Sequence, residues 1–158
     1  MPRIKLGLAT VALLGACSTL GPDGNAGSGP LRLTASIGRE VLATGDTTSL
    51  VFELRNVSGE SVKVNAGGCF ILPFIQDRPS ATIVYPVSGQ WVCTADFREL
   101  TLAPGEAARR TLLVRGRTDE SPPGAGAELP VGEYAAYGVL SPQPGVTLRS
   151  ALVTFSIR

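Results

Sequence analysis

The stretch SLVFELRNV, residues 49–57, places apolar and polar side chains in alternation. Leu50, Phe52 and Leu54 occupy every second position, and Glu53 lies between two of them. Successive side chains of a strand point to opposite faces of a sheet, so a period of two predicts a strand that is buried on one face only. The segment therefore predicts a half-buried β-strand that contributes three large side chains to a core.

The segments around this strand show the same kind of pattern, and hardly any stretch has the 3.6-residue period of a helix. Clusters of Gly, Pro, Asn and Asp separate them, as turns do. About nine such strands in one domain predict an all-β fold, an antiparallel two-sheet sandwich with Greek-key links, and a β-barrel is the main alternative. The expected strands are 31–38, 49–57, 61–66, 69–76, 80–87, 96–102, 106–116, 132–140 and 147–157.

The amino terminus has the three-part shape of a secretory signal. Basic Arg3 and Lys5 precede an uncharged run at 6–16, and Cys17 follows. The run of 11 residues is too short to cross a bilayer as a helix, because crossing takes about 20 residues. We therefore expect a signal peptide at 1–16 and no retained transmembrane anchor.

The end of this signal, Leu14-Gly15-Ala16-Cys17, resembles the lipobox of bacterial lipoproteins. The resemblance implies diacylglycerol on the Cys17 sulfur, cleavage before Cys17 and, in most cases, a fatty acid on the new amino group. Several acyl chains hold a protein on a membrane stably, whereas a single chain anchors it only marginally. An ordinary signal peptide in which Cys17 is incidental is the alternative.

The residues after Cys17 predict a tether. The segment 18–30 is rich in Gly, Ser, Pro, Asp and Asn and has no apolar period, which is typical of a flexible linker. Ser18 after the acylated cysteine resembles lipoproteins that are sent to an outer membrane. We expect a signal peptide at 1–16, acylated Cys17 with its linker at 17–30, and a folded domain at 31–158. The protein would be exported and anchored to a membrane of the cell envelope, the outer membrane where the cell has one, on its periplasmic or surface side.

The mature chain, 17–158, has 142 residues, which is enough for one domain with a substantial core. Removal of Arg3 and Lys5 leaves 12 Lys and Arg residues against 13 Asp and Glu residues, a net charge of −1. This balance predicts no nucleic-acid partner.

Four arginines lie close together in the sequence: Arg109, Arg110, Arg115 and Arg117. They form either a small anion-binding patch or the solvent face of a strand. Charges that alternate along a strand favour the solvent face, so we expect these side chains to be exposed.

The chain contains no histidine, which excludes Ser–His and Cys–His nucleophile pairs and the usual zinc and copper imidazole sites. Asp96 and Glu99 would suit acid–base chemistry in principle, but they flank apolar strand positions and are more simply turn and surface groups. We therefore expect a protein that is not an enzyme, with no catalytic residue, no metal and no cofactor.

With Cys17 assigned to the lipid, Cys69 and Cys93 remain as an even pair in an oxidising compartment. A disulfide between them would close a loop of 25 residues and stabilise the fold by roughly 3 kcal/mol. Two buried thiols are the alternative. Trp91, the single tryptophan, lies beside Cys93 and is expected to pack on the disulfide in the core, with a ligand platform as the alternative.

Two further segments predict structural roles. Asn56-Val57-Ser58 fits either a strand-end turn or a glycosylation sequon, and the turn is the simpler interpretation. Tyr134 follows Gly132 at the entry to a strand, where sandwich folds often use a tyrosine hydroxyl to tie a corner.

Three segments resemble, in their order and spacing, the BsuPI-type intracellular proteinase inhibitor domain: LVFELRNVSGESVKV (50–64), LTLAPGEAARRTLLV (100–114) and LPVGEYAAYGVL (129–140). The resemblance covers roughly 48–140 and implies an immunoglobulin-like sandwich of a kind found in bacterial secreted proteins and lipoproteins. The chain departs from the family pattern at GGCFILPFIQD (67–77) and GQWVCTADF (89–97), each of which contains a cysteine.

These features predict a membrane-anchored lipoprotein whose sandwich is a non-catalytic protein-binding module, using an edge strand or the end loops. The family resemblance implies the alternative, a proteinase inhibitor that acts through an exposed loop, for which 118–130 is the candidate. The expected partners are thus the membrane, through Cys17, and either a protein of the envelope or a protease.

Overall fold

The computed structural model describes residues 29–68, 70–93, 96, 98–116, 127–143 and 146–158. These residues form strands and no helix, which confirms the all-β prediction, and none of them belongs to a helix long and apolar enough to cross a membrane. The strands are β1 (Leu31–Ile37), β2 (Val41–Leu42), β3 (Thr47–Asn56), β4 (Val62–Asn65), β5 (Leu72–Asp77), β6 (Ile83–Tyr85), β7 (Glu99–Leu102), β8 (Ala107–Arg115), β9 (Ala127–Glu128), β10 (Gly132–Gln143), β11 (Val146–Arg149) and β12 (Val153–Ile157).

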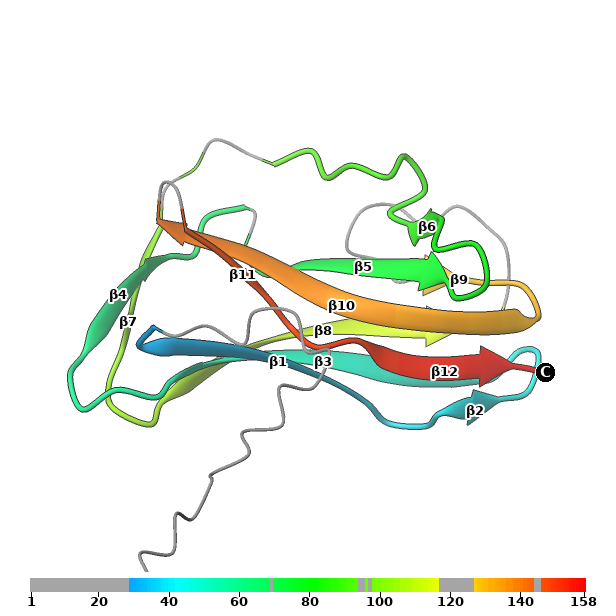
Figure 1. Ribbon diagram of the computed structural model, residues 1–158, viewed down its shortest axis with the longest axis horizontal. Coiled ribbons are helices and arrows are strands. Elements are labelled where there is room, and N and C mark those ends of the chain that lie inside the picture. The colour runs from blue at the N-terminus through cyan, green and yellow to red at the C-terminus, as the bar shows by residue number, and fades with distance from the viewer. Residues whose placement is uncertain (1–28, 69, 94–95, 97, 117–126, 144–145) are drawn as a thin grey trace, which may run out of the picture.

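The strands pack as two layers, in agreement with the predicted immunoglobulin-like sandwich (Figure 1). The first sheet has the order β1-β3-β8-β9, and the second has the order β2-β12-β10-β5-β6, with β11 paired to β10. Strands β4 and β7 form a separate two-stranded ribbon at one end. The pairing is antiparallel except for β2 with β12 and β8 with β9, which are parallel.

The stretch 49–57 has the role that its alternation predicts. Leu50, Phe52 and Leu54 are fully buried between the sheets, and burial of each side chain contributes about 1.5–3 kcal/mol. Opposite them, Gly138 of β10 leaves room for an aromatic ring, because a Cβ atom at this position would lie 2.8 Å from Cδ1 of Phe52. The close approach of the two sheets therefore depends on a glycine at this point.

The first two strands of the domain belong to different sheets. β1 pairs with β3, and the chain then crosses at Gly38 and Arg39 so that β2 can pair with β12. The Arg39 backbone N donates to Oγ1 of Thr48 (3.0 Å), and its guanidinium donates to Oδ2 of Asp46 (3.0 Å) and to the Thr47 carbonyl oxygen (2.9 Å). These bonds fix the crossover at one side of the sandwich.

Asn56 ends β3 as the strand-end turn predicts, and its side chain is fully buried. The Nδ2 group donates to the carbonyl oxygens of Glu60 (2.6 Å) and Leu102 (2.9 Å), while Oδ1 accepts from the backbone N of Ser58 (2.9 Å). One amide thus joins three segments of backbone. Both hydrogens of Nδ2 bond to carbonyl oxygens of the fold. The structure therefore supports Asn56 as a strand-end turn residue and not as a glycosylation site.

Tyr134 ties a corner of the sandwich, as predicted. Its hydroxyl donates to the Pro130 carbonyl oxygen at 2.7 Å, and its ring stacks on Phe155 with centroids 5.3 Å apart. Burial raises the pKa of the Tyr134 hydroxyl above its ordinary value, since the charged form would lose its hydration.

Several strand boundaries differ from the sequence prediction. The segment expected as one strand at 147–157 is divided into β11 and β12 at Ser150, a buried residue whose Oγ accepts from the Gly138 backbone N at 2.9 Å. The hydroxyl takes the place of one ladder acceptor, and the register with β10 shifts by one residue between β11 and β12, both of which run antiparallel to β10. The two-residue strands β2 and β9 have no sequence signal, because their pairing depends on distant segments.

Candidate functional site

The predicted lipid-attachment residue, Cys17, and its motif residues Leu14, Gly15 and Ala16 lie outside the described residues. Cys69 also lies outside them, so the disulfide stays a prediction. The linker at 18–30 is described only at its last two residues.

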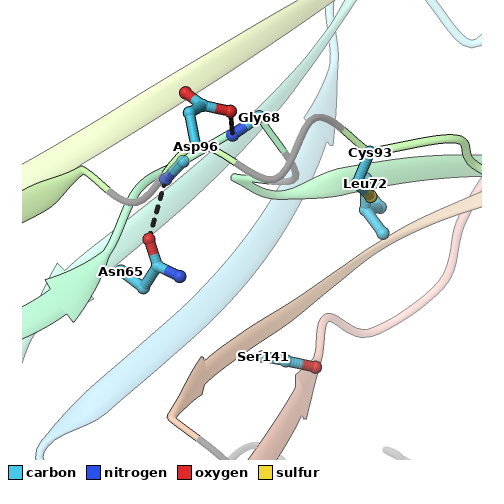
Figure 2. A pocket seen from close by; sticks show the side chains of 7 residues that line it. Asn65, Gly68, Leu72, Cys93, Asp96 and Ser141 are labelled. Carbon is cyan, nitrogen blue, oxygen red and sulfur yellow. Dashed lines mark hydrogen bonds between the residues drawn. The ribbon is translucent and has the colours of Figure 1, made fainter.

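Cys93 lines a hollow of about 270 Å³ near the start of β5 (Figure 2). The hollow is held by two bonds from consecutive glycines, since the Gly67 backbone N donates to Oδ1 of Asn65 (3.0 Å) and the Gly68 backbone N donates to Oδ1 of Asp96 (3.0 Å). A Cβ atom on Gly67 would clash with the Asp96 carbonyl oxygen. A glycine at position 67 therefore lets two backbone segments approach closely.

The two carboxylates considered for acid–base chemistry lie in separate structural contacts. Asp96 holds Gly68, as above, and Glu99 pairs with Lys63 across β4 and β7 at 2.9 Å. Among the residues that the structure describes, no group of three His, Cys, Asp or Glu side chains is placed to hold a metal ion.

The neighbouring arginines of β8 face opposite sides of the sheet. Arg109 is exposed as predicted, and its Nε donates to Oε2 of Glu53 at 2.7 Å. Hydrogen bonds from Arg55 and Arg109 lower the pKa of the Glu53 carboxyl below its ordinary value. Arg110, in contrast, is half-buried at a core-facing position, so the prediction that all four arginines lie on a solvent face is wrong for this residue.

Arg110 ties β8 to the segment before β5. Its Nη1 donates to the carbonyl oxygens of Phe70 (3.1 Å) and Ile71 (3.0 Å), and its guanidinium lies 5.3 Å from the ring centroid of Trp91. Burial lowers the pKa of the Arg110 guanidinium, because a charge is disfavoured in an apolar environment. The carbonyl and ring contacts compensate for that burial.

Trp91 is half-buried, and its contacts favour a structural role over a ligand platform. Its Nε1 donates to the Pro73 carbonyl oxygen at 3.0 Å, and the edge of Tyr85 meets the ring with centroids 5.5 Å apart. Because the Arg110 guanidinium lies over the ring, Trp91 is not free to stack on a planar ligand from that side.

A further candidate for binding is a hollow of about 420 Å³ beside the crossover, between β1 of one sheet and the start of β12 of the other. We call it the edge groove. It has one charged lining residue, and its members come from β1, the crossover and the start of β12: Ala35, Ser36, Ile37, Glu40, Leu152, Val153 and Thr154. It was not predicted as a site, because its position depends on the crossover and not on any local motif.

The alternation of backbone hydrogen bonds along β1 shows which of its N–H and C=O groups point away from β3. Gly38 donates to the Ser49 carbonyl oxygen and Val57 to the Pro30 carbonyl oxygen, so the even-numbered residues of this strand bond to β3. In an antiparallel ladder the alternate residues direct their backbone groups the other way. Leu33, Ala35 and Ile37 thus point N–H and C=O groups away from β3.

The β1 edge differs from the other sheet edges that the structure describes. Natural proteins blunt edges by shortness, proline or charge. The outermost strands β2, β6 and β9 have two or three residues each. The four-residue strands β4, β7 and β11 carry Lys63, Glu99 and Arg149, and the longer β8 carries exposed Arg109. The seven-residue β1 has no charged side chain and no proline from Leu33 to Ile37. Its edge is therefore long and lacks the features that usually prevent another strand from pairing.

No protein-family model matches the chain, and a search of curated protein sequences gives no match. Solved structures that are similar include the β-glucosidase EmGH1 from Erythrobacter marinus, with 10% identity over 81% of this chain and 15% of that chain and a TM-score of 0.45. The CARDB domain of a Pyrococcus furiosus protein, in complex with di-metal ions, has 14% identity over 81% of this chain and 89% of the other and a TM-score of 0.42. Spo0M, a sporulation control protein from Bacillus subtilis, has 10% identity over 82% and 50% of the two chains and a TM-score of 0.47. These are distant likenesses to immunoglobulin-like sandwiches, and the chain spans 15% and 16% of the length of the first two β-glucosidases.

Replacement of the buried arginine tests its structural role. We expect Arg110→Leu to lower the free energy of unfolding by about 2 kcal/mol, because it leaves two carbonyl groups without their donor and removes the contact with Trp91. Arg109→Leu, the matched control, loses an exposed ion pair and should cost less than about 1 kcal/mol. Urea unfolding followed by Trp91 emission measures both values. Equal losses for the two variants would contradict the assignment.

Proposed function

We propose that the protein is an exported lipoprotein, anchored to a membrane of the cell envelope through acylated Cys17, whose sandwich domain is a non-catalytic protein-binding module. The observation that carries the binding proposal is the edge groove, where the edge of β1, uncharged from Leu33 to Ile37, lies beside a hollow lined by apolar and polar residues. The groove offers backbone hydrogen-bonding groups and apolar surface, which is what strand addition and similar modes of peptide recognition use.

The anchor proposal is supported by the sequence of the amino terminus. Leu14, Gly15 and Ala16 precede Cys17 in lipobox order, and the segment that follows has linker composition up to Pro30. The described domain starts with β1 directly after this segment. The order of the segments suits a folded module held a short distance from a bilayer.

The finer family assignment, a BsuPI-type domain, is supported by the three resembling segments and by the places where they lie. The turn at Asn56 and the corner at Tyr134 fall within two of these segments and make the buried contacts described above. The resemblance also implies proteinase inhibition through the loop at 118–130. The described end of that loop is fixed in the fold, since Leu129 is buried and its backbone N donates to the Arg115 carbonyl oxygen at 2.8 Å.

The intact mass of protein extracted from membranes tests the anchor and the disulfide together. We expect the mass of residues 17–158 plus acyl chains, less two hydrogens for a bond between Cys69 and Cys93. Cys17→Ser should carry no acyl chain and leave the membrane fraction. Cys93→Ser, the control, should keep the acyl chains and lose only the two-hydrogen difference. An unmodified Cys17 in the natural protein would rule out the proposed anchor.

A photo-crosslinking side chain placed at Ser36, which lines the edge groove, tests the binding function in intact cells. We expect a discrete adduct with an envelope protein, because the groove is the proposed contact surface. The same side chain at exposed Thr111 on β8 is the matched control and should give no such adduct. Absence of any adduct at both positions would refute the binding module, and an adduct only at Thr111 would move the binding surface away from the groove.

A further inference from the structure

We propose that the edge groove accepts an extended segment of a partner protein as an added strand, antiparallel to β1, with apolar side chains on its inner face and a basic side chain beside Glu40. This inference rests on the proposed binding function and assigns it a mode and a partner chemistry. Its parts are a backbone edge that no described strand covers, a recess with four apolar residues in its lining, and one carboxylate.

The backbone edge supplies the main-chain bonds. Leu33, Ala35 and Ile37 direct their N–H and C=O groups outward, at a spacing that matches alternate residues of an incoming strand. The β2 ladder covers only Ser156 and Ile157 of β12, so it ends before Thr154. Both sheets therefore present strand edge at the groove, on the side where the crossover leaves them uncovered.

The recess suits the side chains that an added strand would direct inward. Among its lining residues, Ala35 and Ile37 are half-buried and Leu152 is 49% exposed. Val41, on the adjacent β2, is 54% exposed. Apolar side chains at alternate positions of a bound segment would cover this surface, and each fully buried one contributes favourably through its removal from water.

Glu40 places a negative charge at one end of the groove. It is the one charged residue in the lining, and within the described residues it forms no ion pair. Arg78, which lines a neighbouring hollow together with Glu40, pairs with Glu133 instead, at 3.5 Å. Glu40 follows the carboxyl end of β1, so it would meet the amino end of an antiparallel segment. A lysine or arginine there complements its charge.

Two capped synthetic peptides of alternating valine and threonine test the inference, one with lysine and one with glutamate at the amino end. Binding to the purified domain, residues 17–158, is measured by calorimetry. We expect the lysine peptide to bind about threefold more tightly, the ratio that an exposed ion pair supplies, and Glu40→Lys to reverse the preference.

Proline variants test the backbone contribution. Ala35→Pro removes one outward N–H without removing a bond to β3, because edge positions with an outward N–H tolerate proline. We expect it to weaken both peptides by about tenfold, whereas Thr111→Pro on the β8 edge, the matched control, should leave binding unchanged. Trp91 emission verifies that each variant is folded. If a proline variant does not fold, the reversed peptide preference of Glu40→Lys tests the inference in its place.

The outcomes separate this inference from the proposed function. Peptide binding that neither Ala35→Pro nor Glu40→Lys alters would overturn strand addition. A Ser36 adduct in cells without any peptide binding would also overturn it, while leaving the binding module in place. Self-association of the protein that Ala35→Pro abolishes would identify a second copy as the occupant and contradict the proposal. Loss of both the adduct and the peptide binding would refute the binding function itself.

Discussion

The crossover at Gly38 and Arg39 is the constraint on which the rest of this sandwich depends. It lets a single segment near the start of the domain pair with β3 of one sheet and then with β12 of the other, so it joins the two layers at their edge. The bonds of Arg39 to Asp46 and Thr48 hold the bend. A chain that changes sheets at this point leaves a gap where neither sheet is completed, and the edge groove is that gap.

The remaining polar contacts reinforce the layers away from the groove. Asn56 binds the end of β3 to the turns around it, Tyr134 fixes the entry to β10, and Arg110 holds the segment before β5 beside Trp91. Each is a polar group that donates to backbone carbonyls from at least a partly buried position, so each is costly to remove and specifies one arrangement. The scaffold is therefore rigid where it is tied and open at the β1 edge, a combination that suits a surface for a partner.

Alternation at Leu50, Phe52 and Leu54 was enough to predict the central strand and, with its neighbours, the sandwich. Local motifs likewise predicted the turn at Asn56 and the corner at Tyr134, because the bonds to Ser58 and Pro130 reach only two and four residues; the bond from Asn56 to Leu102, 46 residues away, had no local signal. The burial of Arg110 was not predictable, since its partners at Phe70 and Ile71 lie about 40 residues away in sequence. The edge groove was hidden for the same reason, because it joins β1 to β12 from opposite ends of the domain. The candidate anchor at Cys17 remains a sequence prediction.

Amide hydrogen exchange along β1 in the purified domain tests the central claim most directly, because it reports which N–H groups are bonded. The account predicts alternation: Thr34 and Ser36, which bond to β3, should exchange at least about a hundredfold more slowly than Leu33, Ala35 and Ile37, whose N–H groups point away from β3. Equal protection of all five amides would mean that the outer edge is already paired, and it would contradict a free edge as the binding surface.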